Sequence, residues 1–374
     1  MRDARLTRRD LLAAPAALAA ARSHPRPAES AVISKDPQSS HGWPTLARLR
    51  SGRLIVVWSG GREAHVCPFG RVEMMTSDDG GRSWTWPRVI LDGAIDDRDA
   101  GVLETSAGTL LVTTFTSLAY EPLLEKAKGW PEERLARWKA AHDRLSAADR
   151  KKELGVWVLR SEDGGRTWSA PRDSLVNSPH GPARLADGRL LYAGKDLWRE
   201  GERVGVCESK DDGKSWSWLA PIPPREGDDP KEYHELHAVE SADGRIVCQI
   251  RNHNRANAGE TLQCESPDGG KTWSAPRGIG VWGLPSHLLR LRDGRFLMTY
   301  GHRRPPFGNQ ARVSADHGRT WSEPLTVSGD GAGGDLGYPS TAELDDGALV
   351  TVWYERLKDS PRAVLRQARW TLPG

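Results

Sequence analysis

The sequence has few of the residues that define small disulfide-rich or membrane-spanning proteins. It holds 4 cysteines in 374 residues, too few for a disulfide scaffold. Apart from a short Ala/Leu run near the N-terminus, no apolar stretch approaches the length of a bilayer span. Basic residues exceed acidic ones by only 3, so we expect no nucleic-acid partner and no membrane span.

The four cysteines give little further information. Cys207 and Cys264 occupy matching CES phrases, which predicts equivalent places in successive repeats. Cys248 and Cys264 are the better candidates for a bridge, if one forms. Their spacings match no zinc-binding pattern, and we expect no metal and no cofactor.

The N-terminal residues contain the phrase LTRRDLLAAPAALAAARS, in which Arg8 and Arg9 precede a short apolar run and small residues at 19–21. This pattern predicts a twin-arginine export signal over 1–21, followed by a flexible segment over 22–30. A disordered basic start is the alternative. We therefore expect the mature protein in the periplasm or outside the cell.

Tryptophan is abundant, with 16 residues against 4 phenylalanines, and part of the excess belongs to a repeated turn. The copies are TSDDGGRSWTWP, SEDGGRTWSAP, SKDDGKSWSW, SPDGGKTWSAP and SADHGRTWSEP, which begin at Thr76, Ser161, Ser209, Ser266 and Ser314. The Ser, Asp, Gly and Thr groups predict a hydrogen-bonded tight turn, with the Trp packed between strands. The ligand spacing of a calcium loop is not met. We interpret these turns as structural.

A second phrase, a small-Gly turn between apolar runs, predicts β-hairpins. Its turn glycines are Gly52, Gly108, Gly188, Gly244, Gly294 and Gly347. Six hairpins, five of them followed by a Trp turn, predict an all-β fold, a six-bladed β-propeller over 31–374. The last blade lacks the Trp turn, so we expect AVLRQARW to pair with a strand near AVIS.

One interval between repeats is longer than the others, and the excess lies at about 121–153. The spacing of Leu123, Leu135, Trp138 and Leu145 among charged residues predicts helix. We expect a helical insertion over one face of the propeller. A separate domain is the alternative, but this stretch has too little apolar material for a core.

The innermost strand of each propeller blade opens onto the central channel, so the start of each strand should contribute to a ring of residues. Counting back nine residues from each hairpin glycine gives the ring positions Trp43, Asp99, Pro179, Glu235, Pro285 and Tyr338. The ends of the second strands add Lys195, Arg251, Arg303, Arg304 and Glu355. Carboxylates, arginines and a tyrosine are thus predicted at one end of the channel.

The repeated Trp turns resemble the Asp boxes of the sialidase (neuraminidase) superfamily, whose propellers have six blades. The order Glu235, Arg251, Arg304, Tyr338, Glu355 is similar to the sialidase series of glutamate, arginine, arginine, tyrosine and glutamate, over roughly 40–370. The resemblance implies an exo-glycosidase that removes an acidic sugar from the end of a glycan.

The resemblance also implies roles for these residues. Tyr338 would be the nucleophile and Glu235 its base, because a neutral phenol is not repelled by the substrate carboxylate. Arg251 and Arg304, with Arg303 beside it, would bind that carboxylate, and Glu355 would fix an arginine. The alternative is that these groups are ion pairs on the rim of a binding or structural propeller.

Two features depart from the sialidase pattern. The family has an arginine two residues before a proline in its first blade, where HGWPTL has Gly42; we expect Arg62 or Arg98 to replace it. The usual acid/base aspartate is also missing. The first-blade loop offers only Glu63, His65 and Glu73, so we predict Asp97 or Asp99 as the acid.

Histidines also recur near the ring, at His41, His180, His234, His237 and His287. We predict that His237 and His287 contact the substrate. A metal site on the HELH phrase is the alternative, disfavoured because two histidines three apart on a strand face opposite sides.

Taken together, the export signal and the resemblance to sialidases imply an exported retaining exo-glycosidase, most specifically an exo-α-sialidase or a relative that acts on another acidic sugar. Two hypotheses from other classes stay open. One is a non-catalytic glycan-binding propeller; the other is a polysaccharide lyase in which Tyr338 and a histidine abstract a proton.

Overall fold

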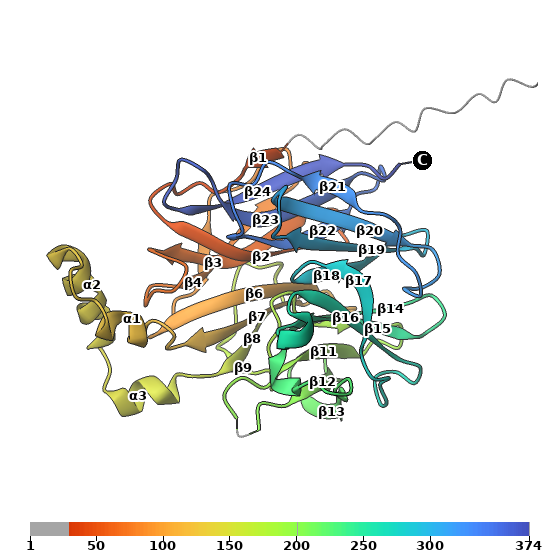
Figure 1. Cartoon of the computed structure of the whole chain (residues 1–374), viewed down its shortest axis with the longest axis horizontal. Helices are drawn as coiled ribbons and strands as arrows, with labels where there is room; N and C mark the ends of the chain where they lie inside the picture. Colours follow the sequence, from red (N-terminus) through yellow and green to blue (C-terminus); the bar gives the residue numbers. More distant parts are fainter. Residues whose placement is uncertain (1–29, 200, 374) are drawn as a thin grey trace, which may run out of the picture.

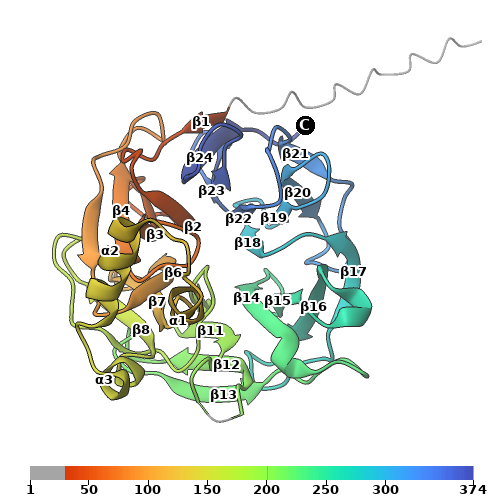
Figure 2. The ribbon, with the colours of Figure 1, turned by 60° about the vertical axis from the view of Figure 1, so that its left-hand side comes forward.

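The computed structural model describes residues 30–199 and 201–373 (Figure 1). The predicted export signal over 1–21, and all but the last residue of the segment 22–30, lie outside these residues. Within them, the strands form six four-stranded sheets arranged around a common axis (Figure 2). This confirms the predicted six-bladed propeller.

Each of the first five blades is a meander of four consecutive strands. Blade 1 contains β2 (Ser40–Arg48), β3 (Leu54–Arg62), β4 (Arg71–Ser77) and β5 (Arg88–Leu91). Blade 2 contains β6 (Asp96–Glu104), β7 (Leu110–Ser117), β8 (Val156–Ser161) and β9 (Arg172–Asp173). Blade 3 contains β10 (Ala183–Arg184), β11 (Leu190–Lys195), β12 (Val204–Ser209) and β13 (Ser217–Pro221).

The remaining blades follow the same order, with one difference at the end. Blade 4 contains β14 (Tyr233–Glu240), β15 (Ile246–Asn252), β16 (Glu260–Ser266) and β17 (Arg277–Trp282). Blade 5 contains β18 (Ser286–Arg290), β19 (Phe296–His302), β20 (Gly308–Ser314) and β21 (Leu325–Ser328). Blade 6 contains β22 (Leu336–Glu343), β23 (Leu349–Arg356), β24 (Ala363–Trp370) and β1 (Ser30–Val32).

The N-terminal strand β1 closes the ring of blades. It pairs antiparallel with β24, placing Ser30 opposite Ala368 and Val32 opposite Arg366. The predicted joining of AVLRQARW to AVIS is therefore confirmed. Closure covers the outer edge of β24, which would otherwise expose unpaired backbone groups.

Glycine turns join the first two strands of every blade, as predicted. All six hairpin glycines have a positive φ between +80° and +91°, which a residue with a Cβ adopts only with strain. In blade 1, for example, the amide of Gly52 donates to the carbonyl of Leu49 at 2.9 Å.

The Asp boxes are closed turns at the ends of the third strands. In the copy at Ser161, the serine hydroxyl donates to Asp163 and accepts from the amide of Gly165, both at 2.8 Å, while Asp163 accepts from the amide and hydroxyl of Thr167. The other copies repeat this pattern of bonds. Their serine and aspartate groups are used within the turn, which supports a structural role.

The Asp-box tryptophans pack between neighbouring blades. Trp168, from blade 2, lies against a cluster that contains Ile55 and Val57 of blade 1. Trp273, from blade 4, joins a cluster with Leu191 of blade 3. The core is thus a set of apolar layers between adjacent sheets, and it leaves the channel ends free for polar groups.

The helical insertion is confirmed. It contains α1 (Glu121–Glu125), α2 (Glu132–His142) and α3 (Ala147–Lys152), and it lies on blades 1 and 2 (Figure 2). Trp138 of α2 is fully buried and packs with Tyr120 and Cys67, the last in the loop after β3. The helices are therefore fixed to the propeller by a small apolar cluster of their own.

Two remaining features bear on the sequence expectations. Cys248 of β15 lies opposite Cys264 of β16, but all four cysteines, which fall within the described chain, are free thiols. None of the helices in the described chain has the length and apolar character needed to cross a membrane.

Candidate functional site

The ring positions have an unusual backbone. Trp43, Asp99, Glu235 and Tyr338 all have positive φ angles, between 39° and 54°. The strand register shifts at each of these places, as in a β-bulge. A bulge re-aims a side chain, and non-glycine residues in this conformation gather at functional sites because the strain needs a compensating role.

Glu235 and Tyr338 lie in direct hydrogen-bond contact across the channel, although 103 residues separate them in the chain. The tyrosine hydroxyl donates to Oε1 of Glu235. Arg251 bridges the pair: its Nη1 lies 2.8 and 2.6 Å from the two carboxylate oxygens and 3.2 Å from the tyrosine oxygen. The structure thus brings together the predicted nucleophile, base and first arginine, hereafter the Tyr–Glu–Arg cluster.

The electrostatics of this cluster keep the tyrosine neutral and the glutamate charged. Burial disfavours the carboxylate of Glu235, but the charge and hydrogen bonds of Arg251 outweigh this and hold its pKa below the usual range. Burial and the adjacent Glu235 charge raise the pKa of Tyr338 well above that of a free phenol. The resting pair is therefore a phenol hydrogen-bonded to a carboxylate.

Of the two predicted arginines at the end of β19, only Arg303 faces the cluster. Its guanidinium carbon lies 5.9 Å from the centre of the Tyr338 ring, and its Nε donates to the carbonyl of Leu336 at 2.8 Å. Its terminal nitrogens make no hydrogen bond within the described chain. Arg304 instead lies over the ring of Trp282 at 5.4 Å, so of the two arginines Arg303 is the one beside Tyr338.

Asp99 and Asp97, the two predicted acids, have different surroundings. Burial raises the pKa of Asp99 to about 7, Arg98 opposes the shift and Glu235 adds to it. Burial also raises the pKa of Asp97 to about 7, but its Oδ2 accepts from the amide of Gly93 at 2.6 Å, in the loop after β5. Asp99 also shares the positive φ of Glu235 and Tyr338 at the ring positions, whereas Asp97 does not.

Arg62, one of the two arginines expected to replace the missing first-blade arginine, is not available to bind a substrate. It is fully buried, and two of its nitrogens bind the carboxylate of Asp96 at 2.6 and 2.9 Å. Arg98 is less committed: it lies 3.8 Å from Asp96, and its Nε is buried without a partner within the described residues. Both guanidinium groups stack on Trp43, at 4.8 and 4.3 Å from the ring centre.

Glu63, directly after β3, contacts the helical insertion rather than the Tyr–Glu–Arg cluster. It accepts from the indole of Trp138 at 3.1 Å and pairs with Arg134 and Arg137, both at 3.2 Å. These bonds commit the carboxylate of Glu63 to α2.

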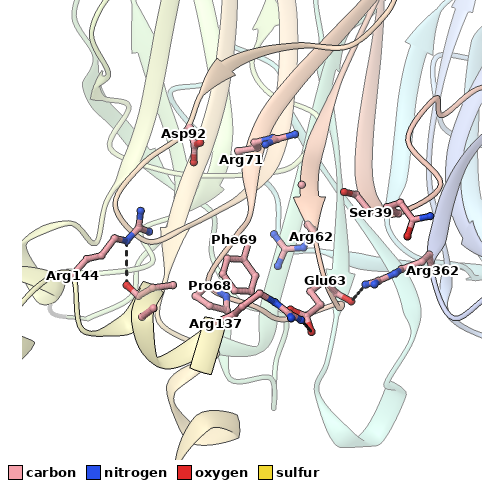
Figure 3. Close-up of a pocket in the computed structure, with 14 residues that line it drawn as sticks. Ser39, Arg62, Glu63, Pro68, Phe69, Arg71, Asp92, Arg137, Arg144 and Arg362 are labelled. Carbon is pink, nitrogen blue, oxygen red and sulfur yellow. Dashed lines mark hydrogen bonds and ion pairs between the residues drawn. The ribbon is translucent and has the colours of Figure 1, made fainter. Parts of the chain in front are cut away.

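The insertion also forms one wall of a cavity of about 670 Å³ (Figure 3). Arg71, Arg137, Arg144 and Arg362 line it. Arg144 donates only to the backbone carbonyls of Ala141 and Ala94 within the described chain, and Arg362 to that of Glu63. A smaller cavity of about 160 Å³, lined by Trp43 and Tyr354, shares Arg62 and Glu63 with it. The large cavity is thus a basic annex next to the ring.

The prediction that Glu355 supports a site arginine is corrected by the structure. Glu355 accepts from the indole of Trp353 at 2.8 Å and pairs with Arg366, so it lies between sheets. Strand alternation explains this, because successive residues of β23 face opposite sides. Tyr354 is the residue that faces the ring; its ring centre is 5.8 Å from that of Tyr338 and its hydroxyl donates to Asp335 at 3.1 Å. We missed Tyr354 by counting positions without regard to parity.

His237 and His287 also lie elsewhere than predicted. Together with His180 they form a group of rings within the channel, 4.7 to 5.3 Å apart. The two predicted residues line a cavity of about 410 Å³ at the opposite, hairpin end, with Arg50 and Arg290. Burial lowers the pKa of His237 to about 3, so it is neutral near pH 7. These histidines fill the channel beneath the ring.

The two histidines of the HELH phrase lie on either side of the bulge at Glu235 and have different neighbours. His237 points into the channel, whereas His234 lies with His253, at 4.6 Å between ring centres, and with Glu232. His253 was not selected from the sequence, because only the pairing of β14 with β15 brings it to this place.

Three comparisons with known proteins agree with the fold and with the resemblance. A family model described as a BNR repeat-like domain matches residues 135–351. A sialidase from Bacteroides fragilis (strain YCH46) is 24% identical over 343 residues, or 83% of this chain; the chain spans 59% of the length of that protein.

Solved structures show the same architecture. A protein of unknown function from Dyadobacter fermentans DSM 18053 is 23% identical, with a TM-score of 0.74 over 94% of this chain and 100% of its own. The intramolecular trans-sialidase from Ruminococcus gnavus, solved with oseltamivir carboxylate, is 14% identical, with a TM-score of 0.66 over 94% of this chain and 98% of its own.

Proposed function

Since the chain belongs to the BNR repeat-like family and its fold is that of the sialidases, we propose that it is a retaining exo-glycosidase for a terminal acidic sugar, sialic acid or a close relative. One observation carries the proposal: the Tyr338 hydroxyl donates to the carboxylate of Glu235, with Arg251 bridging both, at strained backbone positions. A rim ion pair would need neither the tyrosine nor the strain.

The first chemical step is attack by the tyrosine. The Tyr338 oxygen forms a bond to the anomeric carbon while Glu235 takes the phenolic proton. The bond from the anomeric carbon to the leaving oxygen breaks, and Asp99 supplies that oxygen with a proton. The raised pKa of Asp99, about 7, keeps a protonated fraction available near neutral pH.

The second step reverses the roles. Water attacks the anomeric carbon, Asp99 removes its proton, and Glu235 returns a proton to the departing tyrosine oxygen. Two displacements at one carbon retain its configuration. A carboxylate nucleophile would be repelled by an anionic substrate, and the neutral phenol avoids this cost.

Arginine side chains account for the preference for an acidic sugar. Arg251 and Arg303 flank Tyr338, and Arg98 has an unpaired Nε beside Trp43. Forked, charge-assisted hydrogen bonds from such groups suit a carboxylate. Trp43 follows Gly42, which occupies the place of the family's first arginine, so we extend the substrate class beyond sialic acid itself.

The test is turnover of fluorogenic α-sialosides and of aryl glycosides of other acidic sugars, with NMR analysis of the first-formed anomer. The proposal predicts release of the aglycone with retention. Binding without turnover on every sugar would indicate a glycan-binding propeller, and an unsaturated product absorbing in the ultraviolet would indicate a lyase. Either result overturns the proposal.

We also propose that the protein is exported, on the basis of the arginine pair in the sequence alone. Replacing Arg8 and Arg9 by lysine should retain the chain in the cytoplasm of its host. Unchanged export of the double variant, measured by cell fractionation, would contradict a twin-arginine route.

A further inference from the structure

Glu232, His234 and His253 present their side chains on one face of the first hairpin of blade 4. In this hairpin Tyr233 of β14 pairs with Asn252 of β15. The amide of His253 donates to the carbonyl of Glu232 at 2.9 Å, which continues the pairing by one residue. Side chains alternate along a strand and opposed residues share a face, so the three groups converge.

The three side chains offer a donor set for a transition metal. One ligand atom from each lies within 4.8 Å of the other two. Two imidazole nitrogens and one carboxylate oxygen suit Zn²⁺, Co²⁺ or Ni²⁺, whereas Ca²⁺ and Mg²⁺ prefer oxygen ligands throughout. We propose that Glu232, His234 and His253 bind one divalent cation of the zinc class at the ring end of blade 4.

The backbone that carries these ligands is held by hydrogen bonds on both sides. Asp229 caps the short 3-10 helix η1 (Pro230–Glu232), where its Oδ1 accepts from the amide of Lys231 at 2.9 Å. Asn254, next to His253, accepts from the amide of Asp229 at 2.9 Å and donates to its carbonyl at 3.2 Å. The two ligand-bearing segments are therefore tied together before any metal binds, which lowers the ordering cost of binding.

A metal ion has both a route to this place and room for a further ligand. A cavity of about 430 Å³ is lined by Glu232 and His253 and extends along Gly227 and Arg255. Zinc–nitrogen distances of about 2.0–2.1 Å in a tetrahedron place donor atoms about 3.3 Å apart, so small side-chain rotations complete the geometry. Three protein ligands leave one position for water or a substrate oxygen.

Nearby positive charges limit the affinity. The positive charges of Lys195 and Arg251 both disfavour a further positive charge at His234. Lys195 is partly compensated, since its ammonium lies 3.1 Å from Glu202, and Arg251 is paired with Glu235. We therefore expect weaker binding than at a closed structural zinc site.

The site adjoins the Tyr–Glu–Arg cluster, because His234 directly precedes Glu235 in β14 and lies opposite Arg251. It does not depend on the proposed hydrolysis. Binding can be measured without any substrate, so failure of one proposal is distinguishable from failure of the other.

The experiment uses full-length, tag-free, chelator-treated protein titrated with Co²⁺ and then Zn²⁺. Isothermal titration calorimetry and the visible Co²⁺ absorption should both show one ion per chain, and Zn²⁺ should displace Co²⁺. His253→Gln and Glu232→Gln should each weaken binding at least tenfold. His142→Gln, which alters a histidine on α2, is the matched control and should bind as the parent does.

Glu232→Gln guards against a folding artefact, because Glu232 is exposed and its side chain is not needed for the hairpin. The proposal is overturned if the parent binds neither ion below about 1 mM, or if both variants keep the parent affinity. In Zn²⁺-soaked crystals, an anomalous peak among the three side chains would support it, and a peak only elsewhere would refute it.

Discussion

Replacing Tyr338 by phenylalanine separates the chemical role of its hydroxyl from its packing. The hydroxyl donates to Glu235 and accepts from Arg251, and Arg251 keeps its own two bonds to Glu235 when the hydroxyl is gone. Glu235 is therefore not left unpaired in the variant. The free energy of unfolding should fall by about 1 kcal/mol, which lowers the midpoint of thermal unfolding by about 2 °C or less. Loss of the nucleophile should lower turnover at least about a hundredfold, or about 2.7 kcal/mol in barrier.

The matched control is Tyr354→Phe. Tyr354 lies beside Tyr338, and its hydroxyl also makes one side-chain hydrogen bond, to Asp335 at 3.1 Å. It should lose similar stability but keep turnover of a fluorogenic substrate within about threefold. Equal losses of turnover in both variants, or more than a tenth of parental activity in Tyr338→Phe, would refute the assignment of the nucleophile.

Three further predictions test the acid, the basic annex and the Asp boxes. Asp99→Asn should lower turnover of natural glycans about 10²–10⁴-fold but spare activated aryl glycosides, whose leaving groups need no proton. Because the pKa of Asp99 is raised to about 7, kcat/KM of the parent should fall above about pH 7, and this fall should be absent in the variant. Asp97→Asn should show none of these effects. If Asp97→Asn alone gives this contrast, the choice of acid is wrong. If the basic annex binds anionic groups of an extended glycan, the double variant Arg144→Ala/Arg362→Ala should raise KM for such glycans about fivefold and leave KM for small aryl glycosides unchanged. Equal effects on both substrates would show that the annex does not bind the extended glycan. Hydrogen bonds from Thr272 and its neighbours lower the pKa of Asp268 to about 2, and the aspartate pKa is lowered in the other four boxes as well. Stability that is present above pH 4 should therefore be lost as pH falls towards 2. A melting temperature that does not change over that pH range would contradict this.

The repeats made the fold predictable from the sequence. Each blade shows a glycine hairpin, and five blades carry an Asp box, so the count and the closing strand followed from periodicity. The ring positions followed too, because a fixed offset from each hairpin glycine reaches the same level of every blade. Trp43, Asp99, Glu235 and Tyr338 share a positive φ for that reason.

Contacts between side chains were less predictable, because they depend on parity and on pairing across the sheet. Glu355 lies at the predicted level of β23, but its side chain faces away from the ring. The side chain of Tyr354, one residue earlier, faces the ring. His237 belongs to the expected strand, β14, but its side chain lies deeper in the channel than the ring positions do. His253 could be placed beside His234 only once the register of β14 and β15 was known.

The most direct test of the account is to trap the glycosyl–enzyme intermediate. A fluorinated acidic glycosyl fluoride should slow the second step more than the first, and the intact protein should then gain the mass of one sugar. Peptide mapping should place that mass on the peptide containing Tyr338, and the Tyr338→Phe variant should gain none. Turnover of the substrate with the mass on Glu235, or with no covalent adduct at any residue, would contradict the proposed mechanism.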